Sequence, residues 1–188
     1  MTSPRIIDGT AKGLRLKSVP GDITRPITDR VKEALFNILG DDIQGAAFLD
    51  LFGGTGSVGI EALSRGASYV RLIDRHLAAV ATIKANLAHT RLATAAEVIQ
   101  CDAYAHLRQP ADRLFDYIYI APPQYKQMWQ QALQALDANP GWLARNALII
   151  VQIDPKEYQK LEFTHLKEYE QRKYGSTLLV FYEFHPSA

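Results

Sequence analysis

Short apolar runs alternate with stretches of helical spacing through most of the chain. Five runs rich in β-branched and aromatic residues have the length of buried strands: residues 48–52, 69–73, 97–101, 117–120 and 147–153. Runs of this kind, separated by helical stretches, are typical of parallel strands joined by crossover helices. Such sheets bind ligands outside the carboxyl ends of their strands. We therefore expect an α/β protein with its functional residues at those ends.

Both ends of the chain show the alternation of antiparallel strands. Residues 5–19 alternate between polar and apolar positions around Gly9 and Gly13, which predicts a β-hairpin. Residues 163–169 and 177–184 predict an antiparallel strand pair that finishes the sheet.

The region after the hairpin begins with a helix. Thr28 is a suitable N-cap, an apolar helical face follows it, and Gly40 is a suitable stop. Ser57 is a possible cap of the next helix. We expect an N-terminal hairpin extension over residues 1–24 and one main domain over residues 25–188.

Composition limits the possible classes of protein. The chain has 188 residues, of which 47% are hydrophobic and 22% charged, as in ordinary globular domains. No apolar stretch approaches the roughly 20 residues of a membrane span, and residues 1–5 carry no signal core. The single cysteine, Cys101, fits a reducing compartment, so we expect a cytoplasmic protein without a membrane partner. The five histidines show no metal-ligand spacing.

Charge is unevenly distributed although the net charge is only +1. Residues 1–32 contain seven Lys and Arg residues against three Asp residues. A basic segment on a nearly neutral protein indicates either a polyanionic partner or a solvated surface, and charge alone does not decide between them.

A glycine-rich turn follows the first predicted strand. The sequence from Gly53 to Gly59 contains G-x-G-x-x-G, and Asp74 lies 20 residues after Gly54. This spacing suits a dinucleotide whose ribose contacts Asp74. However, Asp50 lies three residues before the first glycine, where it would repel a pyrophosphate and attract a cation. Asp50 therefore favours the cationic methionine end of S-adenosylmethionine.

Three segments carry a family resemblance. Asp50-Leu-Phe-Gly-Gly-Thr-Gly56 resembles the D-x-F-x-G-[ST]-G motif of class I S-adenosylmethionine-dependent methyltransferases. Together with residues 25–39 and 59–67, it resembles the RsmD family over nearly the whole chain. The resemblance implies a Rossmann-like methyltransferase fold with a mostly parallel seven-stranded sheet and helices on both faces. It also implies methylation of the exocyclic N2 of one guanine in 16S ribosomal RNA.

The resemblance implies a role for each strand end. Asp50 would hold the amino-acid end of the cofactor, Asp74 the ribose hydroxyls and Asp102 the adenine amine. The complete expected set is Asp50, Phe52, Gly53, Gly54, Thr55, Gly56, Asp74, Arg75, Asp102 and Ala103.

The loop after the fourth predicted strand is expected to be catalytic. Amino methyltransferases of this type usually carry [DN]-P-P-[YF] there, and this chain has Ala121-Pro122-Pro123-Gln124-Tyr125. Ala121 lacks the side-chain acceptor, so the main-chain carbonyls and the Gln124 amide would receive the amine hydrogens. Tyr125, one position later than usual, would stack on a flipped-out base.

The predicted partner is 16S ribosomal RNA, within the 30S subunit or an assembly intermediate, bound by a monomer. Candidate phosphate contacts are Arg5, Lys12, Arg15, Arg25 and Arg30. The alternative for Arg25, Asp29 and Arg30 is an internal salt-bridge cluster.

Two other functions remain open on the sequence. One is an adenine-N6 methyltransferase on DNA, although no separate target-recognition region is evident. The other is a non-catalytic S-adenosylmethionine-binding module in ribosome assembly, which the alanine at position 121 suggests.

Overall fold

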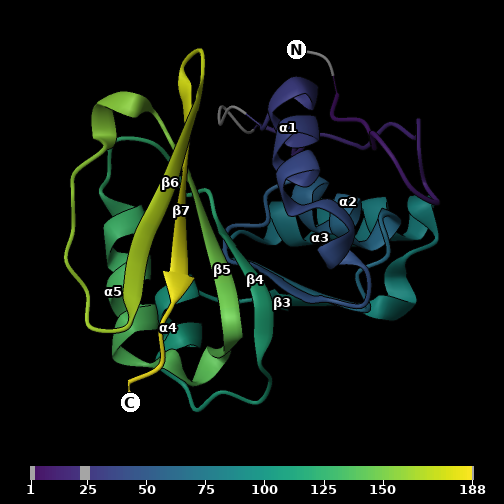
Figure 1. Ribbon diagram of the computed structural model, residues 1–188. Coiled ribbons are helices and arrows are strands. Elements are labelled where there is room, and N and C mark those ends of the chain that lie inside the picture. The colour runs from purple at the N-terminus through teal and green to yellow at the C-terminus, as the bar shows by residue number, and fades with distance from the viewer. Residues whose placement is uncertain (1–2, 22–25, 188) are drawn as a thin grey trace. The chain divides into compact units, whose positions relative to one another are not determined.

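The computed structural model describes residues 3–21 and 26–187. These residues form two compact units, Met1–Cys101 and Asp102–Ala188 (Figure 1). The boundary expected between residues 24 and 25 lies outside the described residues. No helix in the described part of the chain is long and apolar enough to cross a membrane.

The first unit contains three parallel strands in the order β3-β2-β1. Its elements are α1 (Asp29–Leu39), η1 (Gly40–Ile43), β1 (Ala47–Asp50), α2 (Ser57–Ser64), β2 (Tyr69–Asp74), α3 (Leu77–Thr90), η2 (Ala93–Ala95) and β3 (Ala96–Gln100). The strands lie where the apolar runs predict them. Because β1 and β2 are parallel, Asp50 and Asp74 lie at the same edge of the sheet.

The ends of the first two helices differ in how well the sequence predicts them. The Thr28 hydroxyl accepts a hydrogen bond from the Val31 N–H at 3.3 Å, and Gly40 ends α1 with φ of 60°. Both expectations are confirmed. The expectation for Ser57 is wrong, because Gly56 is the N-cap of α2 and Ser57 is its first residue.

The N-terminal hairpin is present only in part. Arg5 and Arg15 form an antiparallel bridge. The backbone N–H groups of Ile6, Gly13 and Leu16 donate across it to the carbonyls of Leu14, Ile6 and Pro4, although no longer strand is formed. Side chains of α2 bind the backbone beyond this pairing: Glu61 accepts from the N–H groups of Ile7 and Asp8, and Ser64 Oγ accepts from the N–H of Ala11. We call residues 3–17 the N-terminal segment.

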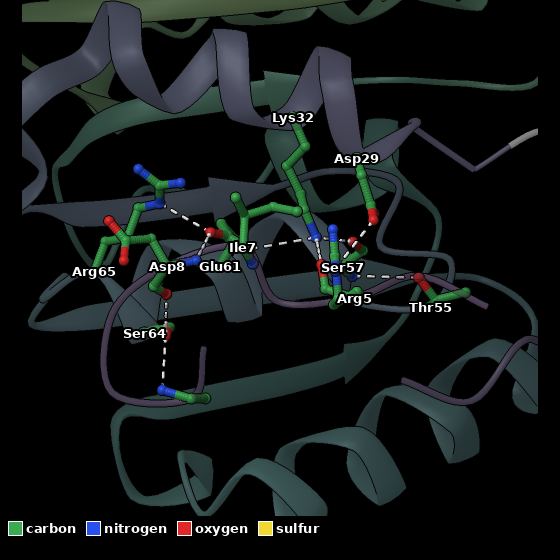
Figure 2. A network of polar contacts seen from close by, with 11 residues as sticks. Arg5, Ile7, Asp8, Asp29, Lys32, Thr55, Ser57, Glu61, Ser64 and Arg65 are labelled. Atoms are coloured by element: carbon green, nitrogen blue, oxygen red, sulfur yellow. Dashed lines mark hydrogen bonds and ion pairs between the residues drawn. The ribbon is translucent and has the colours of Figure 1, made fainter. Parts of the chain in front are cut away.

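A buried ion pair fastens the N-terminal segment to α1 and α2 (Figure 2). Lys32 Nζ lies 3.3 Å from Glu61 Oε2, and both residues are fully buried. The ammonium also donates to the Arg5 carbonyl at 2.6 Å and the Ser57 hydroxyl at 2.8 Å. Burial lowers the pKa of Lys32, and the Glu61 charge opposes that shift. The Lys32 ammonium thus connects α1 to α2 and to the N-terminal segment.

The second unit contains four strands in the order β4-β5-β7-β6. Its elements are α4 (Ala103–Leu107), β4 (Phe115–Ile120), α5 (Met128–Ala138), η3 (Pro140–Trp142), β5 (Leu143–Ile153), η4 (Pro155–Glu157), β6 (Leu166–Tyr174) and β7 (Thr177–Phe184). β4 and β5 are parallel, whereas β7 is antiparallel to both β5 and β6. The long β6–β7 hairpin is visible in Figure 1 and confirms the expected antiparallel pair.

The first strand of this pair begins later than expected. The sequence places it at residues 163–169, whereas β6 starts at Leu166 and continues to Tyr174. The reason is local: the Asp137 carboxylate accepts from the N–H groups of Thr164 at 3.0 Å and His165 at 2.6 Å. These two groups are therefore held by a side chain of α5.

We expect Lys32→Met to lower the free energy of unfolding by about 3 kcal/mol, because it leaves a buried carboxylate without its partner. Lys12→Met is the matched control, since it removes the exposed pair with Asp8 and should change stability far less. Urea unfolding followed by circular dichroism measures both. Equal effects of the two substitutions would contradict a central role for the buried pair.

Candidate active site

Asp50 is an acid without a complete set of partners. It ends β1 and is 1% exposed, and its Oδ1 has no hydrogen-bond partner among the described residues. Burial and the neighbouring Asp74 raise the pKa of Asp50 to about 7, although the backbone N–H groups of Phe52 and Gly59 oppose the shift. A buried carboxylate oxygen of this kind is satisfied by a cation or a strong donor. The site is therefore suited to an ammonium group.

The glycine loop between β1 and α2 presents backbone to open space. Gly54 has φ of +57°, and a Cβ placed on it would meet nothing within 4 Å. Gly53 is the opposite case, because a Cβ there would lie 2.8 Å from Ile83 Cδ1. The loop is thus packed on its inner side and open at Gly54, where a ligand can approach the backbone closely.

Asp74, at the end of β2, supports this loop directly. Its Oδ2 accepts from the Gly54 N–H at 3.0 Å, and its Oδ1 accepts from the His76 N–H at 2.9 Å. The side chain is half-buried, so lone pairs remain for further donors such as ribose hydroxyls. The sequence predicts the ribose contact but not the support of the glycine loop.

The structure brings seven of the expected cofactor residues together at one edge of the first unit. They are Asp50, Phe52, Gly53, Gly54, Thr55, Gly56 and Asp74. Arg75 is exposed, and its Nε lies 3.2 Å from His76 Nε2. Asp102 and Ala103 begin the second unit, where Asp102 caps α4 by accepting from the Ala105 N–H at 2.9 Å. The cofactor contacts of all these residues stay predictions.

The expected catalytic loop follows β4 in the second unit. Ala121, Pro122 and Pro123 are half-buried, whereas Gln124 and Tyr125 are exposed. Tyr125 has φ of 61°, which is uncommon for a bulky residue and often accompanies a functional constraint. The loop therefore presents two exposed side chains on a rigid Pro-Pro base.

Two residues after β5 hold Tyr125 in this conformation. The Tyr125 hydroxyl donates to Asp154 Oδ2 and its N–H donates to Glu157 Oε1, both at 2.7 Å. Asp154 and Glu157 also form the capping box of η4, with Pro155 at its first position. Sequence reasoning missed these supports. The D-x-x-E spacing with proline after the aspartate is the signal that predicts the box.

Comparison with known proteins assigns the chain to a family. A family model described as conserved hypothetical protein 95 matches residues 4–183. Ribosomal RNA small subunit methyltransferase D of Escherichia coli is 38% identical over 148 residues, which cover 79% of this chain and 73% of that protein. This chain belongs to the RsmD family.

Other relatives support the assignment over greater length. The Bacillus subtilis protein YlbH is 37% identical over 181 residues, which cover 95% of this chain and 98% of that protein. The solved structure of the Escherichia coli methyltransferase yhhF has a TM-score of 0.87 and 32% identity, and it covers 97% of this chain and 98% of that one. These similarities confirm the Rossmann-like methyltransferase fold with its mostly parallel seven-stranded sheet. They also confirm an RNA methyltransferase that uses S-adenosylmethionine.

The first unit fits this cofactor. The unpartnered Asp50 oxygen suits the ammonium of its methionine end, and the open backbone at Gly54 allows close approach. The described residues contain no group of three or more His, Cys, Asp and Glu residues that could hold a metal ion.

The candidate RNA contacts of the RsmD-family chain lie near its N-terminus. Lys12, Arg15 and Arg30 are exposed, and Lys12 lies 3.4 Å from Asp8. Arg5 is also exposed and pairs with Asp29 at 3.3 Å. Arg25 lies outside the described residues. The alternative of an internal cluster of Arg25, Asp29 and Arg30 stays a prediction, and the partner of Asp29 in the described residues is Arg5, in a half-exposed pair. RNA binding by these residues stays a prediction.

We expect binding of S-adenosylhomocysteine, which keeps the amino-acid end of the cofactor, to strengthen by about tenfold between pH 6 and pH 8. With a pKa of about 7, Asp50 is mostly neutral at pH 6 and mostly anionic at pH 8, so its attraction for the ammonium grows as pH rises. Calorimetric titration measures the affinity at both values.

Asp50→Asn is the control, because its amide does not titrate and the ionisation of the ligand affects both proteins equally. Parallel pH profiles for the two proteins would remove Asp50 from ammonium binding.

Proposed function

We propose that this RsmD-family enzyme methylates the exocyclic N2 of a guanine in 16S ribosomal RNA. We further propose that it acts as a cytoplasmic monomer on the 30S subunit or an assembly intermediate. The relatives named for small-subunit RNA methylation support the RNA class. The observation that carries the choice of an amine is the Pro122-Pro123 loop after β4.

An exocyclic amine needs orientation because its lone pair is delocalised into the base and makes it a poor nucleophile. Acceptors on both N–H groups hold the nitrogen lone pair in a productive direction. In this loop the acceptors are the carbonyls of Ala121 and Pro122, whose positions the prolines restrict. When bound, S-adenosylmethionine supplies an electrophilic methyl group on a cationic sulfur.

Gln124 compensates for the missing acceptor at Ala121. Its side chain is exposed and makes no hydrogen bond with the described residues, so its amide oxygen is available to an incoming N–H group. An acceptor that is absent from a buried complex costs about 1–3 kcal/mol. Gln124 therefore decides whether the loop keeps full activity without an acidic or amide residue at position 121.

Tyr125 provides a surface for the base. The side chain is 63% exposed, and its hydroxyl is held by Asp154. A ring held at one end loses little conformational entropy when a base stacks on it, and stacking contributes about 1–3 kcal/mol per base. This arrangement supports recognition of a base that has left its helix.

Labelled S-adenosylmethionine tests the proposal directly. The enzyme is incubated with 30S subunits from cells lacking this methylation, with naked 16S RNA and with duplex DNA. We expect label in 30S particles, recovered as N2-methylguanosine after digestion and mass spectrometry. Label only in DNA as N6-methyladenine would establish the alternative enzyme. Binding of the cofactor with no label in any substrate would support a non-catalytic module.

We expect Gln124→Ala to reduce turnover by about 10- to 100-fold, which corresponds to one lost hydrogen bond felt in the transition state. S-adenosylhomocysteine affinity should not change, because Gln124 lies outside the glycine loop. The matched control is Gln131→Ala, an exposed position on α5, which should leave both quantities unchanged. Full turnover in Gln124→Ala would remove this residue from the mechanism.

A further inference from the structure

Asn86 is a buried amide that binds only backbone from distant segments. It lies on α3 with no exposed surface. Its Oδ1 accepts from the Lys17 N–H at 2.8 Å, while its Nδ2 donates to the Lys17 carbonyl at 3.0 Å and the Thr55 carbonyl at 2.8 Å. One side chain therefore joins the end of the N-terminal segment to the glycine loop.

The Thr55 contact fixes a peptide that shapes the loop. The carbonyl of the Thr55–Gly56 peptide receives the Asn86 amide, and the N–H of the same peptide donates to the Gly53 carbonyl at 2.8 Å. Gly56 has φ of +81°, so a small rotation of this peptide would change the turn. Asn86 thus restrains the backbone on which Gly54 is presented.

The other side of Gly56 has a second link to the N-terminal segment. Lys32 donates to the Ser57 hydroxyl and to the Arg5 carbonyl. The two residues that flank Gly56 are therefore connected, through Asn86 and Lys32, to Lys17 and Arg5. The backbone between these two attachment points contains Lys12 and Arg15, both exposed.

We infer that Asn86 is a positioning residue that couples cofactor binding at the glycine loop to order in the N-terminal segment. A ligand that favours the restrained loop also favours the restrained segment, because the same amide holds both. By linkage, a partner that orders the segment tightens cofactor binding by the same factor. That this partner is RNA rests on the proposed function, whereas the coupling does not.

Hydrogen exchange with and without S-adenosylhomocysteine tests the coupling on the full chain without RNA. In the wild-type protein, we expect the ligand to slow exchange several-fold in peptides from residues 3–17. In Asn86→Ala, we expect that protection to disappear and the affinity to weaken by about tenfold, as for the loss of one buried hydrogen bond.

Two further variants separate positioning from general destabilisation. Thr90→Val is the matched control, because Thr90 is buried on the same helix and its hydroxyl bonds only to the carbonyls of Asn86 and Leu87. It should keep both the affinity and the protection. Asn86→Asp has the same size and keeps the acceptor for Lys17, but it places an oxygen against two carbonyls. It should lose the coupling even if Asn86→Ala fails to fold.

Wild-type protection and affinity in a folded Asn86 variant would overturn the inference. So would a ligand that slows no exchange in residues 3–17 of the wild-type protein. Neither result depends on methyl transfer. Conversely, absence of label in every nucleic acid would defeat the proposed function and leave the coupling intact.

Discussion

The buried pair of Lys32 and Glu61 organises the first unit. It connects the N-terminal segment to α1 and α2, beside the bond of Ser64 to the Ala11 N–H and the burial of Ile6 and Leu16. Burying two charges is expensive, and Coulomb attraction offsets the expense only where the remaining donors and acceptors are satisfied. Here Glu61 also accepts from two backbone N–H groups and from Arg65, and Lys32 also donates to two oxygens. The charges are tolerated because each is part of a complete hydrogen-bond network.

Asp50 shows the opposite use of a buried charge. It is as inaccessible as Glu61, yet one of its oxygens lacks a partner and its pKa is raised to about 7. The contrast separates a carboxylate with a complete set of protein partners from one that we expect to bind a ligand. The partners of Glu61 all belong to the protein, so its carboxylate is not available to a ligand. Asp50 keeps one oxygen for a cation or a strong donor, which is the difference that we expect the ammonium of the cofactor to use.

Much of this organisation is predictable from the sequence. Apolar runs located the strands, because burial on both faces requires them, and the glycines after Asp50 located the turn between β1 and α2. Contacts between distant residues were not predictable. Nothing in periodicity indicates that Asn86 binds Lys17, or that Asp137 delays the start of β6. These contacts depend on which helix faces which loop. The N-terminal alternation predicted the antiparallel pairing of residues 4–6 with residues 13–16, but not the contacts of α2 with the turn between them.

The loop after β4, which we expect to be catalytic, illustrates why a departure from a family motif need not abolish a site. β4 and β5 are parallel and pair up to Ile120 and Val151, so the segments after both strands emerge at the same edge. Asp154 and Glu157 can therefore hold Tyr125 from the neighbouring segment. With that support, the position of the ring depends on β5 and η4 as well as on the residue next to Pro123. A motif that is fixed from a second strand can lose one side-chain acceptor and still keep its backbone carbonyls and its aromatic surface.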